Sequence, residues 1–204
     1  MIAIADYGLG NLASVARAMA AIGRPAKLTA DPKAIAKADR LILPGVGAFA
    51  AGMANLAGRG LIEPIKEYIA SGRPFLGICL GLQLLMETSE EGTSAVRQPA
   101  GLGIFAGTVR LLPGPGKVPQ IGWNSLRTNG RHPVLQPLAG QYVYFVHSYY
   151  ADPIDKSLVA AEADAGVTFA AALGRDNILA VQFHPEKSGA VGLDLLRSFC
   201  EAPL

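Results

Sequence analysis

The stretch of sequence that most limits the fold is an apolar run that changes from strand-like to helix-like at a cysteine. Residues 75–78 are apolar and follow a Ser-Gly-Arg-Pro segment, the pattern expected ahead of a buried strand. Residues 80–87 contain good helix formers, with leucines three to four positions apart. The sequence therefore predicts a strand-to-helix turn, with Cys79 at the turn itself.

Glycines flank this cysteine two positions away on each side. Gly77 and Gly81 complete the pattern G-x-C-x-G, the sulfur counterpart of the nucleophile elbow G-x-S-x-G, in which glycines make room for a cramped backbone. A helix N-terminus stabilises negative charge and favours a reactive thiol. A small buried structural cysteine is the alternative, because the motif is short and the chain contains 24 glycines in 204 residues. A nucleophile also needs a base.

Composition excludes several classes of function. A length of 204 residues suits a single domain, residues 1–204. A net charge of +2 without a basic cluster argues against nucleic acid, and no uncharged apolar stretch approaches the roughly 18 residues that span a bilayer. The N-terminus is typical of a first strand rather than a signal peptide. Two cysteines without metal-ligand spacing favour a reducing cytoplasm and predict no metal site.

The first half of the chain alternates strand-like and helix-like segments, which predicts a parallel α/β sheet flanked by helices. From about residue 102 the pattern becomes β-rich, and a last helix follows. No linker or repeat is visible, and the Pro/Gly loop at residues 112–116 is too short to separate domains. The expected strands are residues 2–5, 26–29, 40–43, 75–78, 103–110, 142–149, 158–163, 167–173 and 178–183, and the expected helices are residues 12–22, 61–70 and 190–200, with a short one opened by Asp31 and Pro32.

Three histidines are candidates for the base. His132 precedes a proline in a polar turn, and His147 ends a strand-like run, where packing or substrate positioning is the favoured interpretation. His184 follows the strand expected at residues 178–183 and precedes Pro185 and Glu186. The proline stiffens the turn, so the carboxylate can reach back to fix the tautomer of the imidazole. Cys79 and His184 both lie at strand exits, which predicts a nucleophile, a base and its orienting carboxylate at one edge of the sheet.

A glycine-containing loop, Pro44-Gly45-Val46-Gly47, follows another expected strand. Its backbone N–H groups and that of Leu80 are candidates for an oxyanion hole. A phosphate-binding loop is the rival interpretation, but the Walker lysine and Ser/Thr are missing. The stretch DYGLGN at residues 6–11 likewise lacks the third glycine of a dinucleotide fingerprint.

Taken together, the stretches GICLGLQLL, PGVGAF and FHPEKS resemble the class I, triad-type glutamine amidotransferases. Two more, IAIADYGLGNLASVARA and KVPQIGWNSL, are similar to the glutaminase subunits of imidazole glycerol phosphate synthases of histidine biosynthesis. The resemblance runs from Met1 to about Ser198. It implies an open, mostly parallel, twisted sheet with added antiparallel strands, flavodoxin-like and in one domain. Gln120 stands where histidine is common in that family, which leaves the triad untouched.

The resemblance also implies roles for residues. Cys79 would attack the glutamine amide, His184 would protonate the departing ammonia and then activate water, and Glu186 would orient His184. Ammonia would pass through a channel to a (β/α)₈-barrel cyclase subunit in a heterodimer, with no metal or organic cofactor. The oxyanion donors would be Val46 and Leu80; glutamine would be held by Gly47, Gln83, Ser148 and Tyr149; and Asn11, Trp123, Tyr144 and Lys187 would face the partner.

Three alternatives remain open at this stage. A triad glutaminase that serves a different synthase would have the same catalytic residues, although the N-terminal and GWN stretches argue against it. A Cys-His peptidase would use a similar sheet. A noncatalytic subunit that stabilises a cyclase would keep the interface without needing the triad. For the interface residues the plain alternatives are a core position for Trp123, the single tryptophan, and an ordinary surface charge for Lys187.

Overall fold

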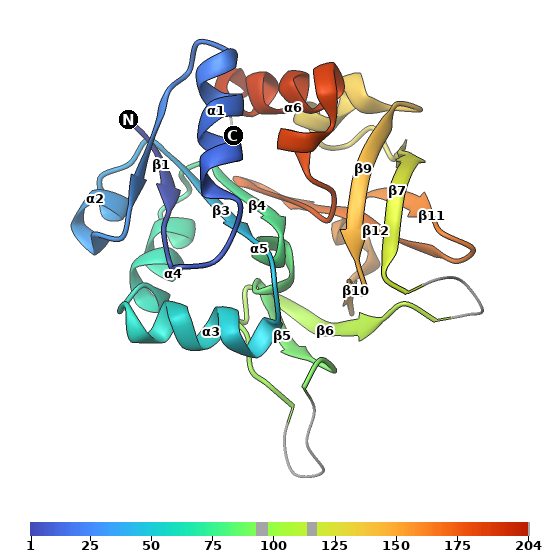
Figure 1. Ribbon diagram of the computed structural model, residues 1–204, viewed down its shortest axis with the longest axis horizontal. Helices are drawn as coiled ribbons and strands as arrows, with labels where there is room; N and C mark the ends of the chain where they lie inside the picture. Colours follow the sequence, from blue (N-terminus) through green and yellow to red (C-terminus); the bar gives the residue numbers. More distant parts are fainter. Residues whose placement is uncertain (93–97, 114–117, 204) are drawn as a thin grey trace.

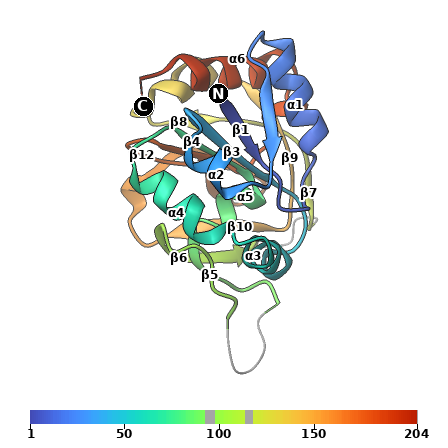
Figure 2. The same cartoon turned by 90° about the vertical axis from the view of Figure 1, so that its left-hand side faces the viewer.

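The computed structural model describes residues 1–92, 98–113 and 118–203. Its centre is an eight-stranded sheet with helices on both faces (Figures 1 and 2). The first five strands in sheet order are parallel and the last three antiparallel. In sheet order the strands are β2 (Ala26–Thr29), β1 (Ile2–Ala5), β3 (Arg40–Gly45), β4 (Phe75–Cys79), β13 (Ile178–Val181), β12 (Thr168–Arg175), β11 (Val159–Asp164) and β8 (Arg127–Thr128).

Two smaller sheets and the helices complete the fold. One small sheet is β10 (Tyr149–Pro153), β6 (Phe105–Leu111) and β5 (Met86–Ser89), and the other is β7 (Gln120–Ser125) and β9 (Tyr142–His147). The α-helices are α1 (Leu12–Ala21), α2 (Pro32–Ala36), α3 (Phe49–Gly58), α4 (Ile62–Ala70), α5 (Leu80–Gln83) and α6 (Gly189–Glu201), and the 3-10 helices are η1 (Pro133–Leu138), η2 (Lys156–Leu158) and η3 (Pro185–Lys187).

The alternating side chains of the parallel strands build a core on each face of the central sheet. On one face, Ile4 and Leu76 pack in the same cluster as residues of α1 and α6. On the other face, Leu43 and Phe75 pack with residues of α2, α3 and α4. The strand order β2-β1-β3-β4-β13 is the flavodoxin-like doubly wound order, in which ligands bind beyond the carboxyl ends of the strands. This architecture confirms the predicted fold class. Within the described residues, no helix combines the length and the apolar character that crossing a membrane requires.

Several expected elements differ in the structure. The helix expected over residues 80–87 is a single turn, because Leu84 and Leu85 are buried and the chain then pairs β5 with β6. The one strand expected over residues 142–149 is two strands, which separate at Ser148 and join different sheets. Strand β7 and helix α3 were not expected from the sequence. Residues 114–116 of the expected Pro/Gly loop lie outside the described residues.

The turn between β4 and α5 lies directly against β3. A Cβ atom at Gly81 would fall far inside van der Waals contact of the Leu43 carbonyl oxygen, and a Cβ at Gly77 would lie 2.9 Å from the carbonyl oxygen of Gly81. Both neighbours are backbone atoms, which cannot rotate away as a flexible side chain would. The two glycines of the sequence motif are therefore required by close packing.

We expect Gly81→Ala to lower the free energy of unfolding by about 3 kcal/mol or more, because β3 and the turn would have to separate. Gly58→Ala is the matched control, since a Cβ at this last residue of α3 meets nothing within 4 Å. It should leave stability unchanged or raise it by about 0.4–1 kcal/mol. Urea unfolding of both variants measures the difference, and equal midpoints would contradict the close-packing argument.

Candidate active site

Cys79 ends β4 and begins the turn of α5 with a strained backbone. Its φ is 54° and its ψ is −107°, a backbone conformation that residues other than glycine seldom adopt. This is the geometry of a nucleophile elbow, in which the side chain leaves the sheet at its carboxyl edge. The residue is 6% exposed, so the sulfur is reached through a cavity rather than from open surface.

His184 lies next to Cys79 and is held by Glu186. The Nδ1 atom of His184 donates to a carboxylate oxygen of Glu186 at 2.8 Å, and both side chains are 1% exposed. This bond leaves Nε2 free for the thiol, although Nε2 has no hydrogen bond of good geometry to any described residue. Burial lowers the pKa of His184, but the interactions with Cys79 and Glu186 outweigh it and raise the pKa to about 9. His184 therefore carries a proton at neutral pH.

The residues that the sequence predicts to bind glutamine and the oxyanion meet at one cavity of about 460 Å³. Cys79 lies in its wall, whereas His184, which interacts with Cys79, and Glu186 are not among the described residues that line it. Every residue expected to bind glutamine or the oxyanion lines this cavity, and so does one residue expected at the interface. These residues are Val46, Gly47, Leu80, Gln83, Ser148, Tyr149 and Lys187; the lining is completed by Glu91, Pro119, Val146 and His147.

Glu91 is a site residue that the sequence analysis missed. Among the described residues lining the cavity it is the one acidic side chain. Its carboxylate accepts a hydrogen bond from the backbone N–H of Phe49 at 2.7 Å and so caps the start of α3. No motif indicates this residue, because it follows β5, a strand absent from the expected pattern.

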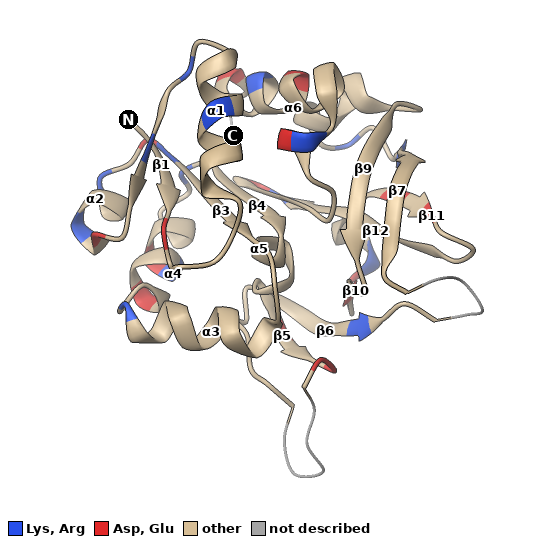
Figure 3. Ribbon diagram, in the orientation of Figure 1, with Lys and Arg blue, Asp and Glu red and all other residues tan. Residues whose placement is uncertain are grey.

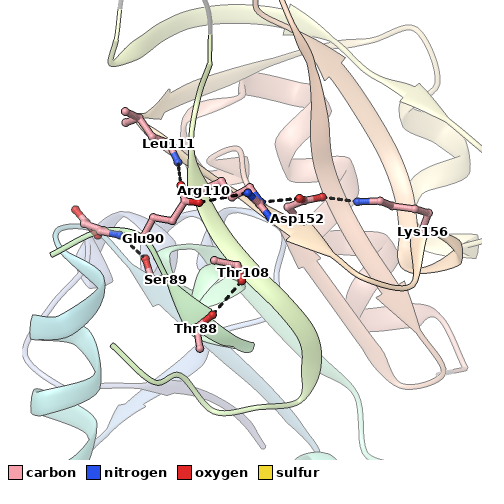
Figure 4. A network of polar contacts seen from close by, with 9 residues as sticks. Thr88, Ser89, Glu90, Thr108, Arg110, Leu111, Asp152 and Lys156 are labelled. Atoms are coloured by element: carbon pink, nitrogen blue, oxygen red, sulfur yellow. Dashed lines mark hydrogen bonds and ion pairs between the residues drawn. The ribbon is translucent and has the colours of Figure 1, made fainter. Parts of the chain in front are cut away.

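A network of polar contacts fixes the segment that carries Glu91 (Figure 4). Ser89 Oγ accepts from the backbone N–H of Glu91 at 3.0 Å. The Arg110 guanidinium lies between two carboxylates, 3.3 Å from Glu90 and 2.8 Å from Asp152. Because Arg110 is on β6 and Asp152 on β10, these contacts join the loop after β5 to the strand that begins at Tyr149.

His147 forms part of the cavity wall and stays neutral. Its Nδ1 donates to the Tyr149 carbonyl at 2.9 Å, because a carbonyl oxygen can only accept, and its buried Nε2 has no partner among the described residues. Burial lowers the pKa of His147 to about 4; the bond to Tyr149 opposes this and the charge of His184 adds to it. The structure therefore agrees with packing or substrate positioning for His147 rather than with a role as base.

Among the expected interface residues, Lys187 lines the cavity, Tyr144 lies next to Lys187, and Trp123 lies next to Tyr144. Trp123 on β7 is 52% exposed, so it is not a core residue. Its ring stacks edge-on against Tyr144 of β9 with centroids 5.9 Å apart, and Lys187 Nζ lies 5.8 Å from the centroid of the Tyr144 ring. Asn11 precedes α1, a helix that contacts η3. Across the described ranges, no group of three His, Cys, Asp or Glu side chains is arranged to hold a metal ion.

Comparison with known proteins identifies the class of protein to which the chain belongs. Residues 3–201 match the family model described as glutamine amidotransferase class-I, and the chain belongs to that family. The chain is also similar throughout to three curated proteins named imidazole glycerol phosphate synthase subunit HisH. It is 51% identical to the one from Syntrophotalea carbinolica, and the match covers 98% of both chains. It is 47% identical to the one from Dehalococcoides mccartyi, and the match covers 100% of this chain and 98% of that relative. It is 49% identical to the one from Methanothermobacter thermautotrophicus, and the match covers 98% of both chains. Within the class, it is therefore a member of the HisH family.

Solved structures support the same fold at low sequence identity. One described as a glutamine amidotransferase has a TM-score of 0.76 and 19% identity, with 98% of each chain covered. PurLQS from Thermotoga maritima has a TM-score of 0.75 and 17% identity, and the match covers 98% of this chain and 96% of that one. The solved structures confirm the fold, and the family model and the HisH relatives confirm the resemblance drawn from the motifs.

The buried neutral His147 predicts a pH dependence of stability. Its pKa is about 4 in the folded chain against 6.5 when unfolded, so between these values the unfolded chain binds the proton and the folded chain does not. Stability should therefore fall as pH falls from about 6.5 towards 4, by on the order of 3 kcal/mol from this group. Urea unfolding of His147→Gln across this range should give a flatter profile than the parent. His132 is present in both proteins and contributes equally to both profiles. An identical slope of unfolding free energy against pH in the two proteins would therefore contradict the assignment of this pH dependence to His147.

Proposed function

We propose that this chain hydrolyses glutamine to glutamate and ammonia through Cys79, His184 and Glu186, and supplies the ammonia to a cyclase subunit that makes imidazole glycerol phosphate. The observation that carries the proposal is the pairing of a strained, buried cysteine with a protonated histidine held at 2.8 Å by a buried carboxylate. The HisH name of its relatives supports the choice of synthase over another ammonia-consuming enzyme. A cytoplasmic site of action fits a biosynthetic role.

The chemistry balances with these three residues and water. Cys79 Sγ attacks the side-chain carbonyl carbon of glutamine, and His184 gives its proton to the nitrogen as the C–N bond breaks, which releases ammonia and leaves a thioester. Neutral His184 then takes a proton from water as the oxygen attacks the thioester carbon. Collapse releases glutamate, and the proton returns to the Cys79–His184 pair. Glu186 stabilises the imidazolium in both steps.

The negative oxygen of each tetrahedral intermediate needs donors. The backbone N–H groups of Leu80 and Val46 are the candidates, since both residues line the cavity next to Cys79. Leu80 follows the nucleophile directly, as in other elbows. If the Val46 peptide must reorient to complete this pair, the free chain is nearly inactive until its partner binds.

The rest of the cavity suits the amino-acid end of glutamine. The carboxylate of Glu91 offers a charged partner for the α-ammonium group. Gly47, Gln83, Ser148 and Tyr149 supply polar backbone and side-chain groups around it. A cavity lined by one acidic side chain, one lysine and several neutral polar groups fits a small zwitterion better than a peptide, which favours a glutaminase over a peptidase.

An uncharged, partly apolar face supports the docking of a partner subunit. Strands β7 and β9 contain no Lys, Arg, Asp or Glu (Figure 3). Their outward positions include Ile121 and Tyr142, each 60% exposed, besides Trp123 and Tyr144. Exposed aromatic residues grouped in this way are typical of protein interfaces. Val146, on the same strand, also lines the catalytic cavity, so ammonia could leave towards a (β/α)₈-barrel cyclase docked on this face.

Glutamate release from glutamine is the direct test of the activity. We expect the parent chain to release glutamate strongly in the presence of the cyclase subunit and its nucleotide ligand, and weakly alone. Cys79→Ala should lose this activity in every mixture, because no other group supplies the nucleophile. Equal turnover with and without the cyclase would contradict activation by the partner. Glutamine-dependent synthesis that survives Cys79→Ala would favour the noncatalytic subunit.

Glu91→Gln tests the charge that binds the substrate. The variant keeps an oxygen to cap Phe49 N–H but loses the negative charge, so KM for glutamine should rise roughly tenfold or more with kcat little changed. Steady-state glutaminase kinetics with the cyclase present measure both constants.

A substrate analogue supplies the control for this variant. Glutaramate lacks the α-ammonium group and should be hydrolysed with a similar KM by the parent and by Glu91→Gln. The exposed Glu63 of α4 provides a second control, and Glu63→Gln should leave both constants unchanged. A rise of KM for glutamine and glutaramate alike would show that Glu91 acts through the fold rather than through charge.

A further inference from the structure

We propose that Gln182 is a further catalytic residue, whose side-chain amide donates a hydrogen bond to the sulfur of Cys79 and stabilises its ionised form. Gln182 follows β13, two positions before His184, and is fully buried. Its Nε2 lies 3.6 Å from Cys79 Sγ, within the longer range of hydrogen bonds to sulfur. The proposal rests on the proposed role of Cys79 as nucleophile and adds a residue to that site.

A chain of hydrogen bonds sets the orientation of this amide. It begins at the backbone carbonyl of Tyr149, which can only accept and therefore faces Nε2 of Gln83, at 2.9 Å. The same Nε2 donates to Oε1 of Gln182 at 3.2 Å. Since Oε1 of Gln182 is held there, its Nε2 must face the other way, towards the sulfur. The assignment of Gln182 Nε2 as the donor to Cys79 thus follows from the Tyr149 carbonyl, which can only accept a hydrogen bond.

The partners of Gln182 distinguish it from a structural buried amide. Asn177 provides the comparison, because it lies just before β13 and Gln182 just after it. The Asn177 amide donates to two backbone carbonyls, Ile69 at 3.0 Å and Arg73 at 2.8 Å, and so holds the fold together. The described side-chain hydrogen bonds of Gln182 run instead to Gln83 and Cys79, both in the wall of the cavity.

A donor aimed at sulfur favours the charged form of the thiol. A thiol accepts hydrogen bonds weakly, whereas a thiolate accepts them strongly, so an N–H fixed at this position stabilises the ionised state. Burial strengthens the effect, since no water competes for the sulfur on the Gln182 side. Cys79 then has two sources of stabilisation, protonated His184 on one side and the neutral Gln182 amide on another.

The test uses the pH dependence of Cys79 alkylation in the full chain. Cys200 is partly exposed and would react as well, so all proteins carry Cys200→Ser. Gln182→Met removes the donor and keeps the length and approximate volume of the side chain. The alkylation rate with iodoacetamide, followed by mass spectrometry, should reach its midpoint roughly one pH unit higher than in the Cys200→Ser parent. Glutaminase kcat with the cyclase present should fall roughly tenfold, with KM nearly unchanged.

Asn177→Leu is the matched control for loss of a buried amide. It should lower thermal stability and leave the alkylation midpoint where it is in the parent. A folded Gln182→Met protein with an unshifted midpoint would overturn the proposal. If Gln182→Met does not fold, Gln182→Glu replaces it, because a carboxylate still accepts a hydrogen bond from Gln83 but places negative charge beside the sulfur. The alkylation midpoint of Gln182→Glu should also rise. An unchanged midpoint would again overturn the proposal.

The two proposals fail in different ways. A shifted midpoint in Gln182→Met, combined with no glutamate release by the parent in any mixture, would retain the Gln182 donor and reject the glutaminase. Strong release by the parent with an unshifted midpoint would retain the glutaminase and reject the donor.

Discussion

The structure depends on the contact between the turn after β4 and the backbone of β3. Gly81 packs on the carbonyl of Leu43, and a Cβ at Gly45 would clash with Tyr7 Oη and lie 2.8 Å from the Cβ of Leu80. With no side chains between them, the ends of the two strands approach closely, and the cysteine between Gly77 and Gly81 takes a positive φ. The same contact brings the Leu80 and Val46 backbones to one cavity. Strain at Cys79 and convergence of the candidate oxyanion donors thus have a common cause.

Two buried histidines near Cys79 show how neighbouring groups decide protonation. Interactions with Cys79 and with the carboxylate of Glu186 raise the pKa of His184 to about 9 despite burial. His147 faces a neutral carbonyl, and its pKa falls to about 4. The thiol group of Cys79 and the carboxylate of Glu186 together offset the cost of burying an imidazolium at His184, whereas the single carbonyl partner of His147 does not. His184 therefore holds a proton beside Cys79, whereas His147 gives the cavity wall a neutral ring, although both residues lie at strand ends, His147 at the end of β9 and His184 after β13.

Sequence patterns predicted the parts of the molecule that depend on local constraints. The elbow glycines and the His-Pro-Glu turn are short motifs with a direct steric or electrostatic reason, and the structure brings Cys79 and His184 together as expected. The helix after Cys79 was too long in the prediction, because the pairing of β5 with β6 outweighs the helix propensity of that segment. Glu91 and Gln182 escaped notice for a related reason. Glu91 belongs to a loop placed by that pairing, and Gln182 sits inside an apolar run whose partners are distant in sequence.

The position of the cavity beside β7 and β9 has a chemical consequence for the proposed reaction. Ammonia released into water at neutral pH is protonated and loses its nucleophilicity, so a synthase that uses it benefits from a path closed to water. Val146 and Pro119 give the cavity an apolar wall towards the exposed face around Trp123. Lys187 lies at the same border and disfavours a second cation there. In the free chain this border is open to water, whereas a subunit docked on Trp123 and Tyr144 would cover it. Such docking would join hydrolysis to delivery without any change in the catalytic residues.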